Sequence, residues 1–321
     1  MRLRTTGLMI CLWGLLVTTV YADEPVRLQY KFSPNKPLVY HQVIEKHRTD
    51  KARYVTKTTE LDEVEEKLFL LRPTKEIVNN RQRIQLELIE KPARQVIKKL
   101  KTSSTIEQVG FVKEDEEFFV SQIGEVKVDE ATTAKMQKKE PQPGFLFNEE
   151  SKQDLLRVIL RQLPEKPVVK GDSWTVSDKY SETQTIPVKI PDQPVREAKN
   201  ESETRYKIVC TSAGPVEHAG RTMIKVDFRS KSTGKMTISQ GMGTGLFIPM
   251  IVANFDSECD SGHFLFDPEA GELVALKVAE KQTVYITGLG QLVELSMLIG
   301  FENSPDQVTT VESETTLELL R

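Results

Sequence analysis

The sequence predicts a mainly β fold, with one or more curved antiparallel sheets or a half-barrel packed on a single amphipathic helix at about residues 148–163. Three observations predict it. Short segments of alternating apolar and polar residues recur along the chain, as in half-buried strands. Turn-forming residues separate these segments at short intervals, which is typical of antiparallel meanders. Only one long segment has apolar residues at helical spacing, and the βαβ alternation of a parallel sheet is missing.

The first 22 residues have the features of a secretory signal peptide. Arg2 and Arg4 supply the basic start, Leu8–Val20 is an apolar run, and the small residue Ala22 ends a cleavage motif. We therefore expect cleavage after Ala22 and an exported protein, periplasmic or extracellular, with no integral membrane span after processing. The alternative is an uncleaved N-terminal anchor.

The charge is mixed and mildly acidic. Without Arg2 and Arg4, 42 of the 44 basic residues remain against 47 acidic ones, a net charge of −5. A nucleic-acid partner is not expected, because binding one requires a clustered basic face. The 299 residues that follow the 22-residue signal are enough for one large or two smaller domains.

Two cysteines follow the signal, Cys210 and Cys259. In an oxidising compartment they are candidates for one disulfide. Two buried free thiols are the alternative, because the sequence does not show the pairing geometry.

The N-terminal half begins with two alternating segments, Val26–Phe32 and Leu38–Ile44, separated by a turn cluster with two prolines. They predict an antiparallel hairpin. Leu61–Leu71 fits either a strand or a helix. Further strands are expected at Tyr54–Thr59, Arg83–Leu88, Val96–Leu100, Thr102–Val109, Gly110–Val112, Glu117–Gln122 and Glu125–Val128.

The predicted helix begins at Asn148, which is a suitable N-cap followed by two glutamates in the first turn. Pro164 and Pro167 prevent its continuation. Its apolar face consists of Leu155, Leu156, Ile159, Leu160 and Leu163, with Arg157 and Arg161 off that face.

The stretch Leu163–Trp174 connects this helix to the second set of strands. Gly171 and Asp172 are expected to form a turn, and Trp174 to be a buried anchor. The stretch divides the chain into an N-terminal β-rich half, 23–163, and a C-terminal antiparallel half, 164–321. Since both halves have similar composition, one continuous domain is the alternative.

The C-terminal half continues the same pattern. The turn Asp267–Gly271 is expected to connect a hairpin, and the alternation of Gln307–Leu320 predicts a long closing strand. Other strands are expected at Trp174–Val176, Gln184–Ile190, Tyr206–Cys210, Thr222–Ser230, Met236–Gln240, His263–Phe266 and Leu273–Val278.

No sequence motif indicates catalysis, a cofactor or a metal. His41 and His47 lack a third ligand nearby, and the group Asp256, Cys259, Asp260 and His263 lacks a standard zinc spacing. The glycines of 241–245 precede Leu246 where a dinucleotide fingerprint requires another glycine. We therefore expect no enzyme and assign no catalytic residue.

The segment Leu246–Phe255 is unusually apolar. One interpretation is a buried strand with Pro249 at an edge or a bulge. The other is a flap, hinged by the glycines of 241–245, over an apolar cavity that Leu289–Phe301 also lines. In that case the ligand-binding residues are Leu246, Phe247, Ile248, Met250 and Ile251.

Several motifs resemble a family of exported, β-rich bacterial proteins. They are Tyr30-Lys31-Phe32 with Pro34, Leu38 and Tyr40; Leu163-Pro164, Pro167-Val168, Gly171-Asp172 and Trp174; and Phe266-Asp267-Pro268-Glu269 with Gly271 and Leu273. The resemblance implies an exported β protein and supplies no catalytic residue. A curved sheet around a helix is also similar, more distantly, to the periplasmic lipoprotein-carrier fold.

We therefore expect a non-enzymatic binding or carrier protein, whose partner is an apolar small molecule or a lipid held in a concavity of the sheet. The alternative is a structural or protein-interaction component of the cell envelope, with an envelope protein as partner. A third hypothesis is a hydrolase whose carboxylate pair converges only in the fold.

Overall fold

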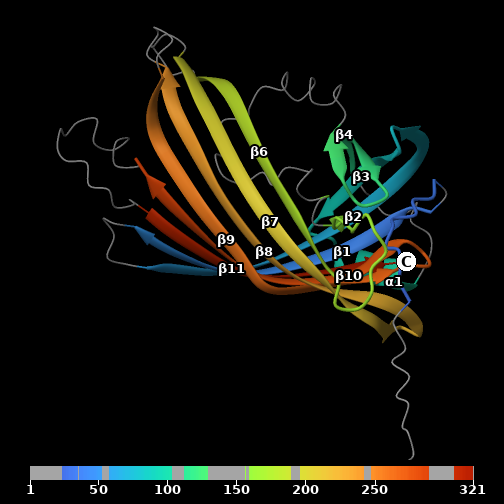
Figure 1. Ribbon diagram of the computed structural model, residues 1–321. Coiled ribbons are helices and arrows are strands. Elements are labelled where there is room, and N and C mark those ends of the chain that lie inside the picture. Colours follow the sequence, from blue (N-terminus) through green and yellow to red (C-terminus); the bar gives the residue numbers. More distant parts are fainter. Residues whose placement is uncertain are drawn as a thin grey trace, which may run out of the picture.

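The computed structural model describes residues 24–34, 36–52, 58–102, 112–128, 156, 159–188, 196–241, 247–288 and 307–320. The predicted mainly β class is confirmed, because these residues form one sheet of 11 strands (Figure 1). In chain order the strands are β1 (Leu38–Ala52), β2 (Thr59–Val78), β3 (Arg81–Glu90), β4 (Val112–Ser121), β5 (Val126–Val128), β6 (Ser173–Val188), β7 (Arg196–His218), β8 (Arg221–Gly241), β9 (Phe247–Asp267), β10 (Glu272–Thr287) and β11 (Gln307–Leu320).

The sheet consists of two antiparallel meanders, β1–β5 and β6–β10, which the last strand joins. β11 pairs with β1 on one side and with β10 on the other. The spatial order is therefore β5-β4-β3-β2-β1-β11-β10-β9-β8-β7-β6. β5 and β6 form the two edges and do not pair with each other, so the sheet is strongly curved but open (Figure 1).

Tight turns connect the long strands. Asn79 and Asn80, with φ of 50° and 59°, form the two-residue turn between β2 and β3. Ala219 and Gly220, with φ of 48° and 74°, do the same between β7 and β8. Positive φ at both central residues matches the right-handed twist of the flanking strands. β7 has 23 residues, far more than the predicted strand Tyr206–Cys210.

The predicted hairpin of Val26–Phe32 with β1 is wrong. Val26 forms only one isolated bridge, to Val168. The Tyr30 amide donates to the Gln122 carbonyl at 2.8 Å. The segment alternates because Leu28 and Tyr30 are buried on one side, and one-sided burial produces the same pattern as a strand in a sheet.

The predicted strand Val96–Leu100 is also wrong, because these residues belong to helix α1 (Arg94–Thr102). Val96 and Leu100 are four residues apart and lie on one helical face, as they also would in a strand. The helix covers the face of the sheet opposite the main core, where Leu100 is buried with Val39, Leu68, Leu70 and Leu320.

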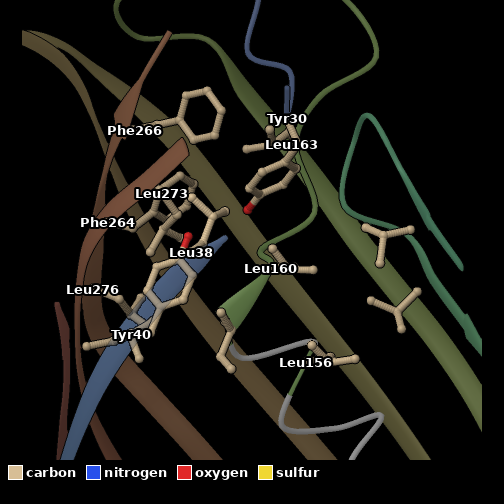
Figure 2. Close-up of a cluster of buried hydrophobic side chains, with 14 of the residues drawn as sticks. Tyr30, Leu38, Tyr40, Leu156, Leu160, Leu163, Phe264, Phe266, Leu273 and Leu276 are labelled. Atoms are coloured by element: carbon tan, nitrogen blue, oxygen red, sulfur yellow. The ribbon is translucent and has the colours of Figure 1, made fainter. Parts of the chain in front are cut away.

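The predicted helix at 148–163 is not confirmed as a packed helix, since most of that range lies outside the described residues. Leu156 and Ile159 have helical backbone, and the Leu160 amide donates to the Leu156 carbonyl at 2.6 Å. The side chains of Leu156, Ile159, Leu160 and Leu163 are all buried in the main core (Figure 2).

The main core lies on one face of the sheet, which we call the inner face. Tyr30, from the segment that precedes β1, is stacked on Phe32 at 5.5 Å and contacts the Phe266 ring edge-on at 5.4 Å. In Figure 2 the leucines of 156–163 lie across from Tyr40, Phe264 and Leu276. One row of this face, aligned across five strands, is Gln42, Leu317, Leu276, Phe264 and Val226.

The stretch Leu163–Trp174 attaches to both meanders. The Leu163 amide donates to the Ile123 carbonyl at 2.8 Å, beside the β4–β5 turn. The Gly171 amide, at φ +92°, donates to the Ser212 carbonyl at 2.7 Å. Asp172 stabilises the turn Val169–Asp172, because its carboxylate accepts a hydrogen bond from the Val169 amide at 2.9 Å.

Candidate functional site

Beyond the main core, the inner face becomes polar. We call this region the polar belt: Lys46, Ser313, Glu280, Gln282, Ser257, Ser230, Ser232 and Tyr206. Strand register places these residues side by side on β1, β11, β10, β9, β8 and β7. Except for Ser257, they are half-buried or exposed. The polar belt thus leaves hydrogen-bonding side chains on the concave face, next to the apolar main core.

The charged groups of the polar belt are satisfied locally. The Lys46 ammonium donates to Glu65 at 2.6 Å. Burial raises the pKa of Glu65, but this hydrogen bond and the lysine charge outweigh the burial, and the pKa is lowered overall. The Ser257 hydroxyl donates to the Glu280 carboxylate. The belt therefore offers hydroxyl and amide groups more than free charge.

A second apolar group lies on the inner face past the polar belt. We call it the far cluster: Ile251, Ala253 and Ile286, with Met236, Ile238 and Val284 packed against them. Ile251 is only 6% exposed, so the centre of this cluster is shielded from solvent. The inner face thus carries two apolar zones with the polar belt between them.

Most of the segment Leu246–Phe255 lies in a strand, while the glycines of 242–245 and Leu289–Phe301, on which the flap interpretation depends, lie outside the described residues. Phe247 to Phe255 belong to β9 and pair with β8. Pro249 lies opposite Ser239, directly beside a bulge, as in the buried-strand interpretation. Of the predicted ligand-binding residues, Phe247, Ile248, Met250 and Ile251 lie in this strand, and Leu246 lies outside the described residues.

Arg161 was missed by sequence reasoning. It lies between the buried Leu160 and Leu163, and its guanidinium carbon is 4.8 Å from the centroid of the Phe228 ring, at the border of the main core and the polar belt. Its Nε is buried without a hydrogen-bond partner. The helical pattern placed Arg161 off the apolar face, and nothing in the sequence indicated that this side also meets the sheet.

The predicted disulfide is not formed, and Cys210 and Cys259 are buried free thiols. Cys210 is on β7 opposite Phe228, and Cys259 is on β9 opposite Ser230, so β8 lies between them. Residues two strands apart have Cα atoms about 10 Å or more from each other, beyond the roughly 4.4–6.8 Å of a disulfide. Burial raises the pKa of Cys210 to about 11 and also raises that of Cys259, so both are protonated thiols.

The outer face carries a shallow groove of about 660 Å³ where β2, β1, β11, β10 and β9 run side by side. Three of its acidic side chains, Asp62, Glu312 and Glu314, form ion pairs. His47 Nδ1 is 2.7 Å from Asp62, and Lys281 donates to Glu312 at 2.7 Å. The Asp62 hydrogen bond raises the pKa of His47. These pairs are exposed, and the groove has the character of a solvated surface.

The metal candidates of the sequence do not converge. The bulge in β9 turns Cys259 toward the inner face, whereas His263, next to the core residue Phe264, faces outward. Among the described residues, no three His, Cys, Asp or Glu side chains are grouped to hold a metal ion. Within the same residues, no helix has the length and apolar character needed to cross a membrane.

No protein-family model and no curated protein sequence matches this chain. Among solved structures, it is similar to Neisserial surface protein A, with 7% identity and a TM-score of 0.21, over 87% of this chain and 96% of that one. It is also similar to a loop L8 deletion mutant of OmpT, an outer membrane protein of Vibrio cholerae, with 7% identity and a TM-score of 0.17, over 88% and 99%. Similarities this weak carry no argument about this chain.

Proposed function

We propose that the protein is a non-enzymatic, exported binding or carrier protein that holds an amphipathic ligand on the inner face of its open sheet. One observation carries this proposal. The polar belt lies between the main core and the far cluster on the same concave face, so a ligand there meets polar groups flanked by apolar ones. Ligand sites combine apolar walls with a few polar groups in this way.

The arrangement favours an amphipathic ligand over a wholly apolar one. An apolar ligand would desolvate polar side chains such as Ser232 and Gln282 without offering them hydrogen bonds, which is costly.

The test is native mass spectrometry of the full chain, tagged and purified from its own cell envelope. We expect a mass above that of the polypeptide, which extraction with organic solvent removes. Ser232→Trp should fill the polar belt and abolish the extra mass. Lys231→Trp, one residue away on the opposite face, is the matched control and should retain it.

An apo mass in every preparation, together with no binding of a hydrophobic dye, would reject the carrier. If a stable envelope protein copurifies instead, the interaction-protein alternative is favoured.

A further inference from the structure

The backbone of Arg161 is held rigidly where it crosses the inner face. Its carbonyl accepts a hydrogen bond from the Tyr30 hydroxyl at 3.1 Å. The next carbonyl, of Gln162, accepts one from the Trp174 indole at 3.3 Å. Gly124 packs so closely that a Cβ there would lie 2.6 Å from the Arg161 carbonyl oxygen. These contacts fix the backbone of Arg161, from which its guanidinium reaches over the Phe228 ring.

The guanidinium has no counter-ion among the described residues. Its Nε is buried without an acceptor, and it forms no ion pair with a described carboxylate. Burial lowers the pKa of Arg161, the direction expected for a cation that has lost water without gaining an anion. The side chain as a whole is half-buried, and a charge removed from water without a partner is destabilising unless one is supplied.

The thiols close to Arg161 are neutral, because Cys210 and Cys259 lie on the strands flanking β8 and burial keeps both protonated. Among the described carboxylates, Glu280 acts on Arg161 through its charge, but it forms no ion pair with the guanidinium and accepts the Ser257 hydroxyl within the polar belt. Stacking on the Phe228 ring occupies the face of the guanidinium. It leaves the planar edge of N–H donors, which matches a carboxylate or a phosphate.

We infer that Arg161 binds the anionic group of the ligand, a carboxylate or a phosphate, with the rest of the ligand lying along the polar belt. This inference rests on the proposed function and adds the class of head group to it. The ligand then supplies a counter-ion that the described residues do not. Free small anions and lipid head groups share this chemistry.

The test compares probes that differ only in the head group. Delipidated full chain is titrated with dodecanoate, dodecyl phosphate and the uncharged dodecanol, and separately with inorganic phosphate. We expect the wild type to bind an anionic chain about tenfold or more tightly than dodecanol, the effect of a hydrogen-bonded ion pair. Arg161→Gln should remove this preference, Arg161→Lys should retain part of it, and Arg229→Gln, an exposed outer-face arginine on β8, should leave it intact.

The outcomes separate the inference from the proposed function. If dodecanol binds the wild type as tightly as the anionic chains, the carrier function stands, but the binding of an anionic head group by Arg161 is refuted. That role of Arg161 is also refuted if Arg161→Gln keeps the preference for anionic chains. If no probe binds the wild type, both fail. If inorganic phosphate binds the wild type but not Arg161→Gln, the anion-binding role of Arg161 is supported, and its ligand is a small anion rather than a lipid.

The unfolding temperature of a variant provides a second test, which includes a measurement without ligand. Arg161→Met removes the unpaired charge and keeps most of the side-chain volume, so the ligand-free protein should unfold at the same or a higher temperature. The rise in unfolding temperature caused by dodecyl phosphate should disappear in this variant. A large loss of stability in the ligand-free variant would show a structural ion pair instead of a binding group.

Discussion

At the scale of single residues, Trp174 joins the connecting stretch to the core. It lies opposite Cys210 at the start of β6, packs against the main core while partly exposed, and donates its indole N–H to Gln162. We expect Trp174→Ala to lower the free energy of unfolding by about 2–4 kcal/mol, less than for a fully buried tryptophan. Trp174→Phe keeps most of the packing and should cost about 1 kcal/mol for the lost hydrogen bond.

Urea unfolding followed by circular dichroism measures both variants. Val209→Ala, on the exposed side of β7, is the control and should change little. If Trp174→Ala matched that control, Leu163–Trp174 would be a linker without a structural role.

The two cysteines give a direct chemical test at the same scale. In the protein lacking residues 1–22, Cys210 and Cys259 should both resist a chromogenic thiol reagent in the native state, because they are buried and protonated. After denaturation without reductant, two thiols per chain should react. No reactive thiol after denaturation would mean that a disulfide had formed after all.

At the scale of elements, helix α1 covers part of the outer face, where His41 is half-buried. His41 Nε2 is buried without a hydrogen-bond partner, 3.9 Å from a Glu66 oxygen. Burial lowers the pKa of His41 from 6.5, and the Glu66 carboxylate offsets only part of this. The neutral form is therefore favoured in the folded state. Its contribution to stability is present above pH 6.5 and is lost as the pH falls through the folded pKa.

We expect the wild type to lose more stability than His41→Asn between pH 7.5 and 5, a window around the ordinary histidine pKa of about 6.5. Urea unfolding at each pH measures the difference, which cancels the other titrating groups. His218→Asn, at the exposed end of β7, is the control and should follow the wild type. Parallel pH curves for wild type and His41→Asn would contradict this role.

The elements also show what sequence patterns can and cannot predict. Gln307–Leu320 and the turn Asp267–Gly271 were predicted because their alternation and turn residues are local signals. Val96–Leu100 was misassigned, since a spacing of four places two residues on one face of either a strand or a helix. The 23-residue length of β7 was missed because parts of it are polar on both faces. Arg161 and the polar belt depend on which distant strands lie side by side, and periodicity does not encode this.

At the scale of the whole molecule, β11 completes the sheet. It pairs with β1 over Val39↔Leu320 to Ala52↔Gln307, and with β10 on its other edge. Leu317, only 1% exposed, belongs to the main core. Removing residues 307–321 should therefore separate the two meanders and abolish cooperative unfolding, whereas removing Arg321 alone should not. Calorimetry measures this, and a cooperative transition in the longer truncation would show that each meander folds independently.

The position of the last strand also has a consequence for synthesis. Each meander can form from its own hairpins as the chain emerges, but β1 and β10 keep unpaired edges until β11 exists. At about 5–20 residues per second, the 255 residues from the end of β1 to the start of β11 take roughly 13–50 s to translate. For that time the edge of β1 that β11 later covers is unpaired, and the edge of β10 joins it once residue 287 has been made. Unpaired strand edges invite pairing with other chains, so a holding chaperone that shields them until β11 pairs would keep the unfinished protein soluble.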